Sequence, residues 1–219
     1  MRYPNAMMTT VPYLPKEQIE REALSLLDNY FHERGETIQV PVPADEILEA
    51  HLGLSLDFDD LQALLGIPDV LGALWTDKHK VFIDQSLDPE AHPEMEGRYN
   101  FSVGHEIGHW QLHRWHIGSD DGQIEMFGNP KLTIICRASQ SKENIEWQAN
   151  YFSSCFLMPR KLVFGAWSDH FGGLKPSAGT PLHTVACEFA PEFRVSIQAM
   201  QIRLETLNLP AEQDLLGGF

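Results

Sequence analysis

The sequence lacks any long apolar run. No segment of its 219 residues approaches the roughly 20 consecutive apolar residues that a membrane-spanning helix needs. The first 18 residues, MRYPNAMMTTVPYLPKEQ, also lack the apolar core of a signal peptide. We therefore expect a cytoplasmic protein that makes no membrane contact.

Cysteine is scarce as well. The chain has 3 cysteines, and they form no CxxC pair. An odd number at wide spacing argues against a disulfide framework and against a thiolate zinc site, and it fits a reducing cytoplasm. The three residues, which are expected to be small semi-buried side chains, are Cys136, Cys155 and Cys187.

Basic residues are few, 16 against 31 acidic residues, which gives a net charge of −15. Such a surface repels nucleic acid and anionic membranes, and no run of Lys or Arg suggests a local exception. Two short helical patterns around the turn FRVS, residues 193–196, resemble a helix-turn-helix and raise the hypothesis of a DNA-binding regulator. Arg194 and Arg203 are too few cations to support it, so we expect no direct nucleic-acid binding.

The residues that are present predict the α+β fold class, as one mostly helical domain over residues 1–219. Residues 90–100, EAHPEMEGRYN, predict a polar loop. Residues 1–12 are expected to form a loose tail, and residues 183–209 a helical pair packed on the core. Apolar periodicity predicts helices over 15–33, 41–53, 101–118, 142–158, 183–192 and 197–208. A small antiparallel sheet of about three strands is expected from a hairpin of 70–76 and 80–84 with a further strand at 131–137.

The segment HEIGH, residues 105–109, carries the clearest chemical signal. Residues four apart lie on one helix face about 6 Å apart, so His105 and His109 can bind one metal ion through neutral imidazoles. Glu106 can reach a metal-bound water without being a ligand, which suits a general base. Gly108 would allow a substrate or another element to approach closely. The same pattern also arises by chance, and the test is whether a third ligand exists.

The helix expected over 142–158 supplies that ligand. Glu146 lies beside its apolar face, where a solvated charge is less expected, although a surface role remains the alternative. Glu143, one turn earlier, is the competing third ligand. Asn150 lies one turn after Glu146 and could accept a hydrogen bond from the far nitrogen of a ligand histidine. Two imidazoles and one carboxylate suit zinc, one ion per chain, although iron, manganese or cobalt could occupy the same set.

A second electrophile is usual in peptide hydrolysis by such a site, and the sequence leaves its identity open. His113 lies two helical turns after His105, on the same stripe, and could line the site or support a ligand. Tyr151 follows Asn150 directly. The candidates are His113, His116, Tyr99, Tyr151, His170 and His183.

HEIGHWQLH followed by EWQANYFSSCFLMP resembles the ImmA/IrrE family of zinc-dependent metallopeptidases, and the similar order of elements covers most of residues 13–209. The resemblance implies a zincin-like core in which His105, His109 and Glu146 are the metal ligands and Glu106 is the base. Ser153 and Phe156 depart from the family's usual Ala and Leu, Gln148 stands where an acidic residue is common, and the stretch between His109 and Glu146 is longer than in compact members. These departures leave the ligands intact and bear on the shape of the cleft.

Members of this family typically cleave a repressor protein and so relieve transcription of a mobile element or a stress regulon. The resemblance therefore implies a zinc-dependent endopeptidase that hydrolyses a peptide bond in a regulatory protein, such as a transcriptional repressor. The alternative is a zinc-stabilised module that titrates a repressor without cleaving it. The intact Glu106 favours the enzyme. A substrate peptide is expected to add as a strand to an exposed edge of the 70–84 hairpin.

Overall fold

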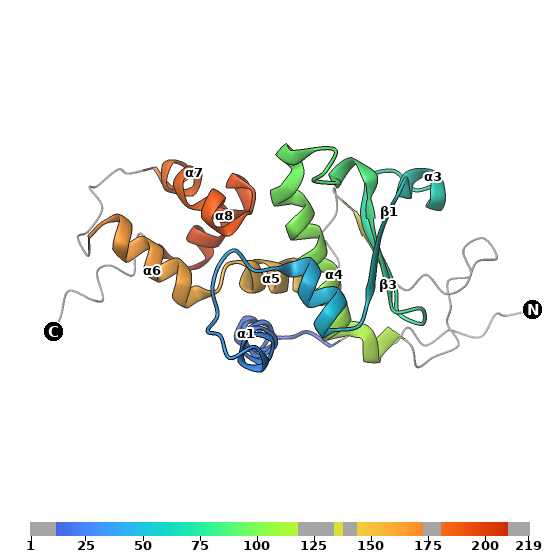
Figure 1. Ribbon diagram of the computed structural model, residues 1–219, viewed down its shortest axis with the longest axis horizontal. Coiled ribbons are helices and arrows are strands. Elements are labelled where there is room, and N and C mark those ends of the chain that lie inside the picture. The colour runs from blue at the N-terminus through green and yellow to red at the C-terminus, as the bar shows by residue number, and fades with distance from the viewer. Residues whose placement is uncertain (1–11, 118–133, 138–143, 173–180, 210–219) are drawn as a thin grey trace, which may run out of the picture.

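The computed structural model describes residues 12–117, 134–137, 144–172 and 181–209, so the predicted tail lies outside them except for Pro12. A four-stranded sheet flanks one side of the long helix α4 (Glu96–Ile117), and three C-terminal helices lie at the opposite end of the molecule (Figure 1). The predicted α+β fold class is confirmed. In the described part of the chain, no helix combines the length and the apolar character needed to cross a membrane.

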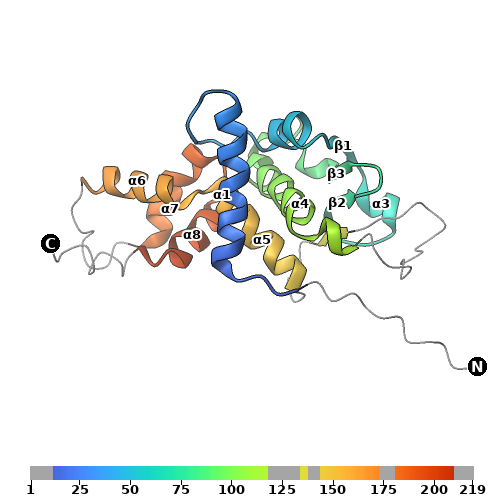
Figure 2. The same cartoon turned by 90° about the horizontal axis from the view of Figure 1, so that it is seen from below.

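Helix α1 (Lys16–Glu33) is the predicted N-terminal amphipathic helix and begins after Pro15. Its buried positions recur at helical spacing, so one face is turned toward the core. That face packs on α5 (Asn144–Leu157), which α1 crosses in Figure 2. The buried residues of α1 are Ile19, Ala23, Leu26, Leu27, Tyr30 and Phe31.

The predicted helix at 41–53 consists of a short α2 (Ala44–Glu46) that continues into a π-helical turn, η1 (Ile47–His51). A strand that the sequence did not predict follows, β1 (Ser55–Asp59), and then a short helix α3 (Leu61–Leu65). Asp60 caps α3 by accepting a hydrogen bond from the backbone N–H of Ala63 at 2.8 Å. These elements place β1 at one edge of the sheet.

The sheet has the strand order β1-β3-β2-β4, with β2 (Val70–Trp75), β3 (Lys80–Asp84) and β4 (Ile134–Arg137). The predicted hairpin of β2 and β3 is confirmed, with Gly72 opposite Ile83 and Leu74 opposite Val81. Strands β2, β3 and β4 form the expected antiparallel set. Strand β1 pairs with β3 in parallel, so the complete sheet is mixed.

This strand order overturns one prediction. Strand β3 is paired on both sides, by β1 and β2, and β2 is paired on both sides, by β3 and β4. The predicted addition of a substrate strand to the hairpin is therefore wrong, because neither hairpin strand has an open edge. The outer positions of the sheet belong to β1 and β4.

Helix α4 begins at Glu96, earlier than the predicted start at residue 101, and the 3-10 turns η2 (Gln85–Leu87) and η3 (Pro93–Met95) precede it. The polar loop predicted over 90–100 is therefore wrong for its second half. Proline at the first position of a helical turn and acidic residues near a helix start are both favourable. Pro93, Glu94 and Glu96 meet these conditions, and the polar composition of the segment concealed them.

Helix α6 (Arg160–His170) follows Pro159, and α7 (Leu182–Phe193) and α8 (Ile197–Thr206) form the predicted C-terminal pair. The turn between α7 and α8 packs on the first turns of α4. A Cβ atom at Gly97 would lie 2.6 Å from the backbone nitrogen of Ser196, and Asn100 donates from Nδ2 to the carbonyl oxygen of Arg194 at 2.8 Å.

The burial of α8 does not follow the polarity of its side chains at two residues. Ile197 is 42% exposed, whereas Arg203 is 0% exposed. Arg203 donates from Nε to the carbonyl oxygen of Met158 at 3.0 Å and from Nη2 to Oε1 of Glu20 at 3.2 Å. A buried arginine is stable only with such partners, and these contacts tie α8 to the end of α5 and to α1.

Candidate metal centre

Helices α4 and α5 approach each other closely at two glycines of α4. A Cβ atom at Gly104 would lie 2.6 Å from Oγ of Ser153, and one at Gly108 would lie 3.1 Å from the carbonyl oxygen of Ala149. Ser153 donates across the interface to the carbonyl oxygen of Phe101 at 2.9 Å. The element that approaches Gly108 closely is therefore α5. Small residues on both helices allow the short distance between α4 and α5.

This packing brings His105, His109 and Glu146 together. Their potential ligand atoms all lie within 4.8 Å of one another. Nε2 of His105 and Nε2 of His109 are 2.8 Å apart, and each is 3.3 Å from a carboxylate oxygen of Glu146. The two histidines are buried, and the Glu146 side chain is 13% exposed.

The second nitrogen of each imidazole faces a partner. Nδ1 of His105 is 3.0 Å from Oδ1 of Asn150. With a cation at the cluster, Nδ1 would donate to this oxygen and Nε2 would present its lone pair. Nδ1 of His109 is 3.0 Å from Nδ1 of His113, which is fully buried. A cation held by Nε2 of His109 would select the tautomer in which Nδ1 of His109 donates to His113.

The charges of the cluster suit a cation. Burial and the neighbouring His105 lower the pKa of His109 to about 3, which keeps its imidazole neutral at neutral pH. Burial acts to raise the pKa of Glu146, but hydrogen bonds to His105 and His109 outweigh it and lower the pKa to about 2. Metal ligands must be deprotonated, and at neutral pH Glu146 is a carboxylate and His109 a neutral imidazole.

Glu106 lies beside the cluster and beneath the sheet. Its side chain is 0% exposed, and neither carboxylate oxygen has a hydrogen-bond partner among the described residues. Burial is the main cause that raises its pKa, to about 8, and the charge of Glu146 acts in the same direction. A buried carboxylate without a hydrogen bond is costly for folding alone, which points to a chemical use.

The other candidate electrophiles contact other groups: Tyr99 stacks on Phe58, His170 pairs with Glu188 and His183 contacts Cys187. The side chain of His116 lies outside the part of the chain that the structure describes.

Tyr151 stacks on Trp147 with ring centroids 5.5 Å apart, and the ammonium of Lys16 lies 5.6 Å from its ring centroid. These contacts hold Tyr151 against the N-terminal part of the chain rather than at the histidines. Gln148 is fully buried and donates to the carbonyl oxygen of Pro12 at 3.2 Å. The glutamine that replaces the usual acidic residue of the family therefore contacts the N-terminal part of the chain.

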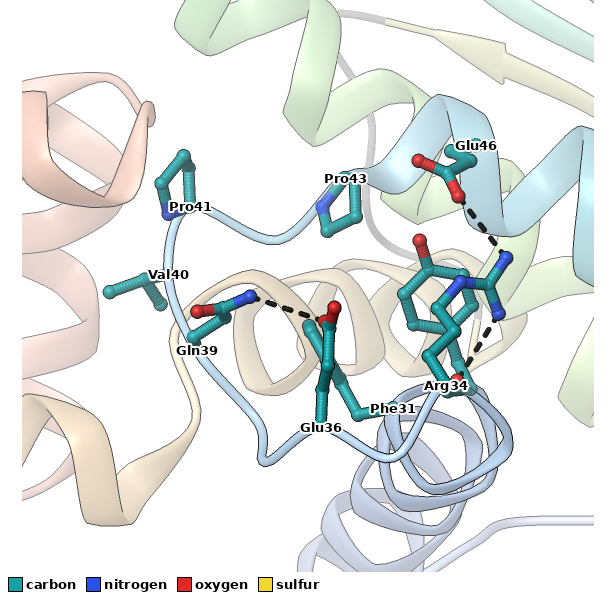
Figure 3. Close-up of a pocket in the computed structure, with 9 residues that line it drawn as sticks. Phe31, Arg34, Glu36, Gln39, Val40, Pro41, Pro43 and Glu46 are labelled. Atoms are coloured by element: carbon teal, nitrogen blue, oxygen red, sulfur yellow. Dashed lines mark hydrogen bonds and ion pairs between the residues drawn. The ribbon is translucent and has the colours of Figure 1, made fainter.

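A hollow of about 440 Å³ lies at the C-terminal end of α1, away from the residues of the cluster (Figure 3). Its polar side chains are already paired with one another. Arg34 donates to Glu46 at 3.1 Å, and Gln39 donates to Glu36 at 3.4 Å. None of the cluster residues lines it, so this hollow is separate from the candidate metal centre.

Helix α4 carries HEIGH on the side of the sheet, and α5 supplies a glutamate to the same cluster. The family model of the IrrE N-terminal-like domain, peptidase family M78, matches residues 87–205, more than half of the chain. The chain therefore belongs to this family. The match includes both helices of the cluster, whereas α1 and strands β1 to β3 precede it.

The chain was also compared with curated proteins and with solved structures. No curated protein matches the chain. A solved structure, described as a Mycobacterium tuberculosis transcriptional regulator, is similar with a TM-score of 0.49 and 18% sequence identity. The similarity covers 91% of this chain and 55% of that chain, so this chain spans about half the length of the structure that it matches.

Proposed function

We propose that this protein is a zinc-dependent endopeptidase that hydrolyses a peptide bond in a regulatory protein, such as a transcriptional repressor. The observation that carries the proposal is the convergence of His105, His109 and Glu146 beside the buried carboxylate of Glu106. Membership of peptidase family M78 supports a metallopeptidase. The regulatory substrate rests on what the resemblance to the ImmA/IrrE family implies.

Zinc fits these residues because two imidazole nitrogens and a carboxylate are a common ligand set for catalytic zinc. His105 and His109 would hold the ion through Nε2, and Glu146 through a carboxylate oxygen. When bound, zinc supplies Lewis acidity that polarises the scissile carbonyl and lowers the pKa of the attacking water. Asn150 and His113 would fix the orientation of the two imidazoles.

Glu106 would accept the proton of the attacking water and then pass it to the leaving amine. A carboxylate is a stronger base when its surroundings disfavour its charge, and the pKa of Glu106 is raised by burial. The close contact with β2 excludes bulk water from one side of the carboxylate. The proton that it takes up would therefore be held for transfer to the amine rather than lost to solvent.

The proposal is tested by metal content and cleavage together. We expect about one zinc per chain by plasma mass spectrometry, and a large loss in Glu146→Ala. Glu106→Gln should keep its zinc and cleave a candidate repressor about 10² to 10⁴ times more slowly. Normal cleavage by Glu106→Gln would exclude the base role. Zinc binding and stable repressor binding without any fragment would establish the titrating module instead.

A further inference from the structure

Gly72 lies inside β2, a strand that is paired on both sides and largely buried. A glycine weakens a strand interior, because it has no side chain to pack and loses the most conformational freedom on folding. Its presence in such a strand therefore calls for a local reason. Two reasons are common: a backbone conformation that only glycine adopts readily, or a close approach by another group.

The backbone does not supply that reason. The glycines with left-handed φ among the described residues are Gly35, Gly53, Gly66 and Gly172, and Gly72 is not one of them. The pairing of β2 with β4 does shift register between Val70 and Gly72, as in a β-bulge. A bulge requires glycine when a residue adopts left-handed φ, so other residues could occupy position 72 as far as the backbone is concerned.

The close approach is made by Glu106. A Cβ atom at position 72 would lie 2.5 Å from Oε1 of Glu106, 3.2 Å from Cδ and 3.3 Å from Cγ. The three nearest atoms all belong to this one side chain. Because Glu106 is 0% exposed, a carboxylate displaced by a Cβ atom would have to move within a closely packed interior.

We propose that Gly72 is a positioning residue for Glu106: the absence of a side chain on β2 reserves the volume in which the carboxylate lies beside the metal cluster. The contact itself is a property of the fold, and its effect on turnover rests on the proposed function. Gly72 precedes the range that the family model matches, so the inference depends on the structure of this chain.

The contact is tested without any substrate by a double-mutant cycle on thermal unfolding. We expect Gly72→Ala to lower the melting temperature by about 5 °C, as overpacking of a core does. In the Glu106→Ala background, which removes the obstructing atoms, Gly72→Ala should lower the melting temperature by less than half as much. Gly104→Ala is the matched control, because its Cβ atom would meet Ser153 instead. It should lower the melting temperature by the same amount in both backgrounds.

Equal shifts for Gly72→Ala in the two backgrounds would overturn the proposal. If Gly72→Ala fails to fold, the variant that also carries Glu106→Ala must fold, and failure of both would overturn the proposal as well. With a cleavable substrate, Gly72→Ala should keep its zinc and its KM within about twofold while kcat falls about 10- to 100-fold. An unchanged kcat would refute positioning, whereas absence of cleavage by the wild type would refute the proposed function and leave the unfolding cycle as an independent result.

Discussion

The Glu106 carboxylate is buried beneath β2, and burial raises its pKa to about 8 from the ordinary value of 4.5. The folded protein therefore binds more protons than the unfolded chain between these two pH values, and stability falls as pH rises through that range. His109 acts in the opposite direction, because its pKa is lowered to about 3 from 6.5 and stability rises with pH up to 6.5. Above pH 6.5, Glu106 therefore has the larger effect of the two on how stability changes with pH.

We predict that the free energy of unfolding of the chelator-treated protein falls between about pH 6.5 and pH 8, by at most about 1.4 kcal/mol per pH unit. Glu106→Gln cannot titrate and should remove this decline. Urea unfolding at several pH values, with the wild type and Glu106→Gln measured in parallel, tests the prediction. An identical slope in both proteins would assign the decline to another group.

Asn150 accepts from Nδ1 of His105, and loss of such a partner typically weakens metal affinity about 10- to 100-fold. We expect Asn150→Ala to lose zinc affinity in that range in a competition with a chromophoric chelator. Ser153→Ala is a suitable control, because Ser153 lies on the same helix and donates to the carbonyl oxygen of Phe101 rather than to a histidine. Unchanged affinity in Asn150→Ala would show that the ring is fixed by other contacts.

At the scale of the elements, the distance between α4 and α5 sets the cluster. Gly108→Ala would place a methyl group 3.1 Å from the carbonyl oxygen of Ala149 and press α5 away. We predict a loss of about 1–3 kcal/mol in the free energy of unfolding, together with weaker zinc binding, because Glu146 lies on the displaced helix. Denaturant unfolding and metal competition measure the two effects.

Gly165 in α6 provides the matched control for that variant. A Cβ atom at Gly165 would meet nothing within 4 Å, and its φ is not left-handed. Gly165→Ala should therefore stabilise the helix by up to about 1 kcal/mol and leave zinc binding unchanged. Equal changes in the free energy of unfolding and in zinc binding for the Gly108 and Gly165 variants would show that the close contact of α4 with α5 does not determine the cluster.

Local periodicity explains which elements could be predicted from the sequence. The helices α1, α5, α7 and α8 show the apolar repeat of an amphipathic helix, and the hairpin shows two apolar runs around a polar turn. Helical spacing also places His105 and His109 on one face of α4 and Glu146 beside the apolar face of α5, and the structure brings these two faces together. Strand β1 has exposed acidic residues at alternate positions and was missed, because an edge strand with one solvated face has little apolar signal.

Contacts between distant segments could not be predicted in this way. The approach of Gly72 to Glu106 joins two elements whose separation in sequence carries no periodic signal. A glycine inside an otherwise apolar strand was the available hint, and it indicates a close approach without naming the partner. The contact between His109 and His113 stays open in the sequence for a different reason, because a position on this helix stripe allows His113 either to line the site or to support a ligand.

At the scale of the whole molecule, Arg203 links three helices that are far apart in sequence. It is 0% exposed, and it contacts the carbonyl oxygen of Met158 and the carboxylate of Glu20. We predict that Arg203→Ala lowers the free energy of unfolding by about 3–5 kcal/mol, the usual cost of breaking a buried pair. Equilibrium unfolding in urea measures this loss.

Arg160 provides the comparison, because it pairs with the same carboxylate of Glu20 at 3.1 Å while its side chain is 48% exposed. An exposed pair of this kind contributes about 0–1 kcal/mol, so Arg160→Ala should be nearly neutral. Similar losses for the two arginine variants would mean that Glu20, rather than the burial of Arg203, determines the energy of this junction.

The contact of α4 with α5 through Gly104 and Gly108 also bears on how freely the chain between His109 and Glu146 can vary. That contact, rather than the chain between the two helices, fixes the distance from α4 to α5. When two points are already held together, the entropy cost of a longer connection grows only with the logarithm of its length, about 0.6 kcal/mol for each doubling. The convergence of His105, His109 and Glu146 therefore does not require a connection of one particular length.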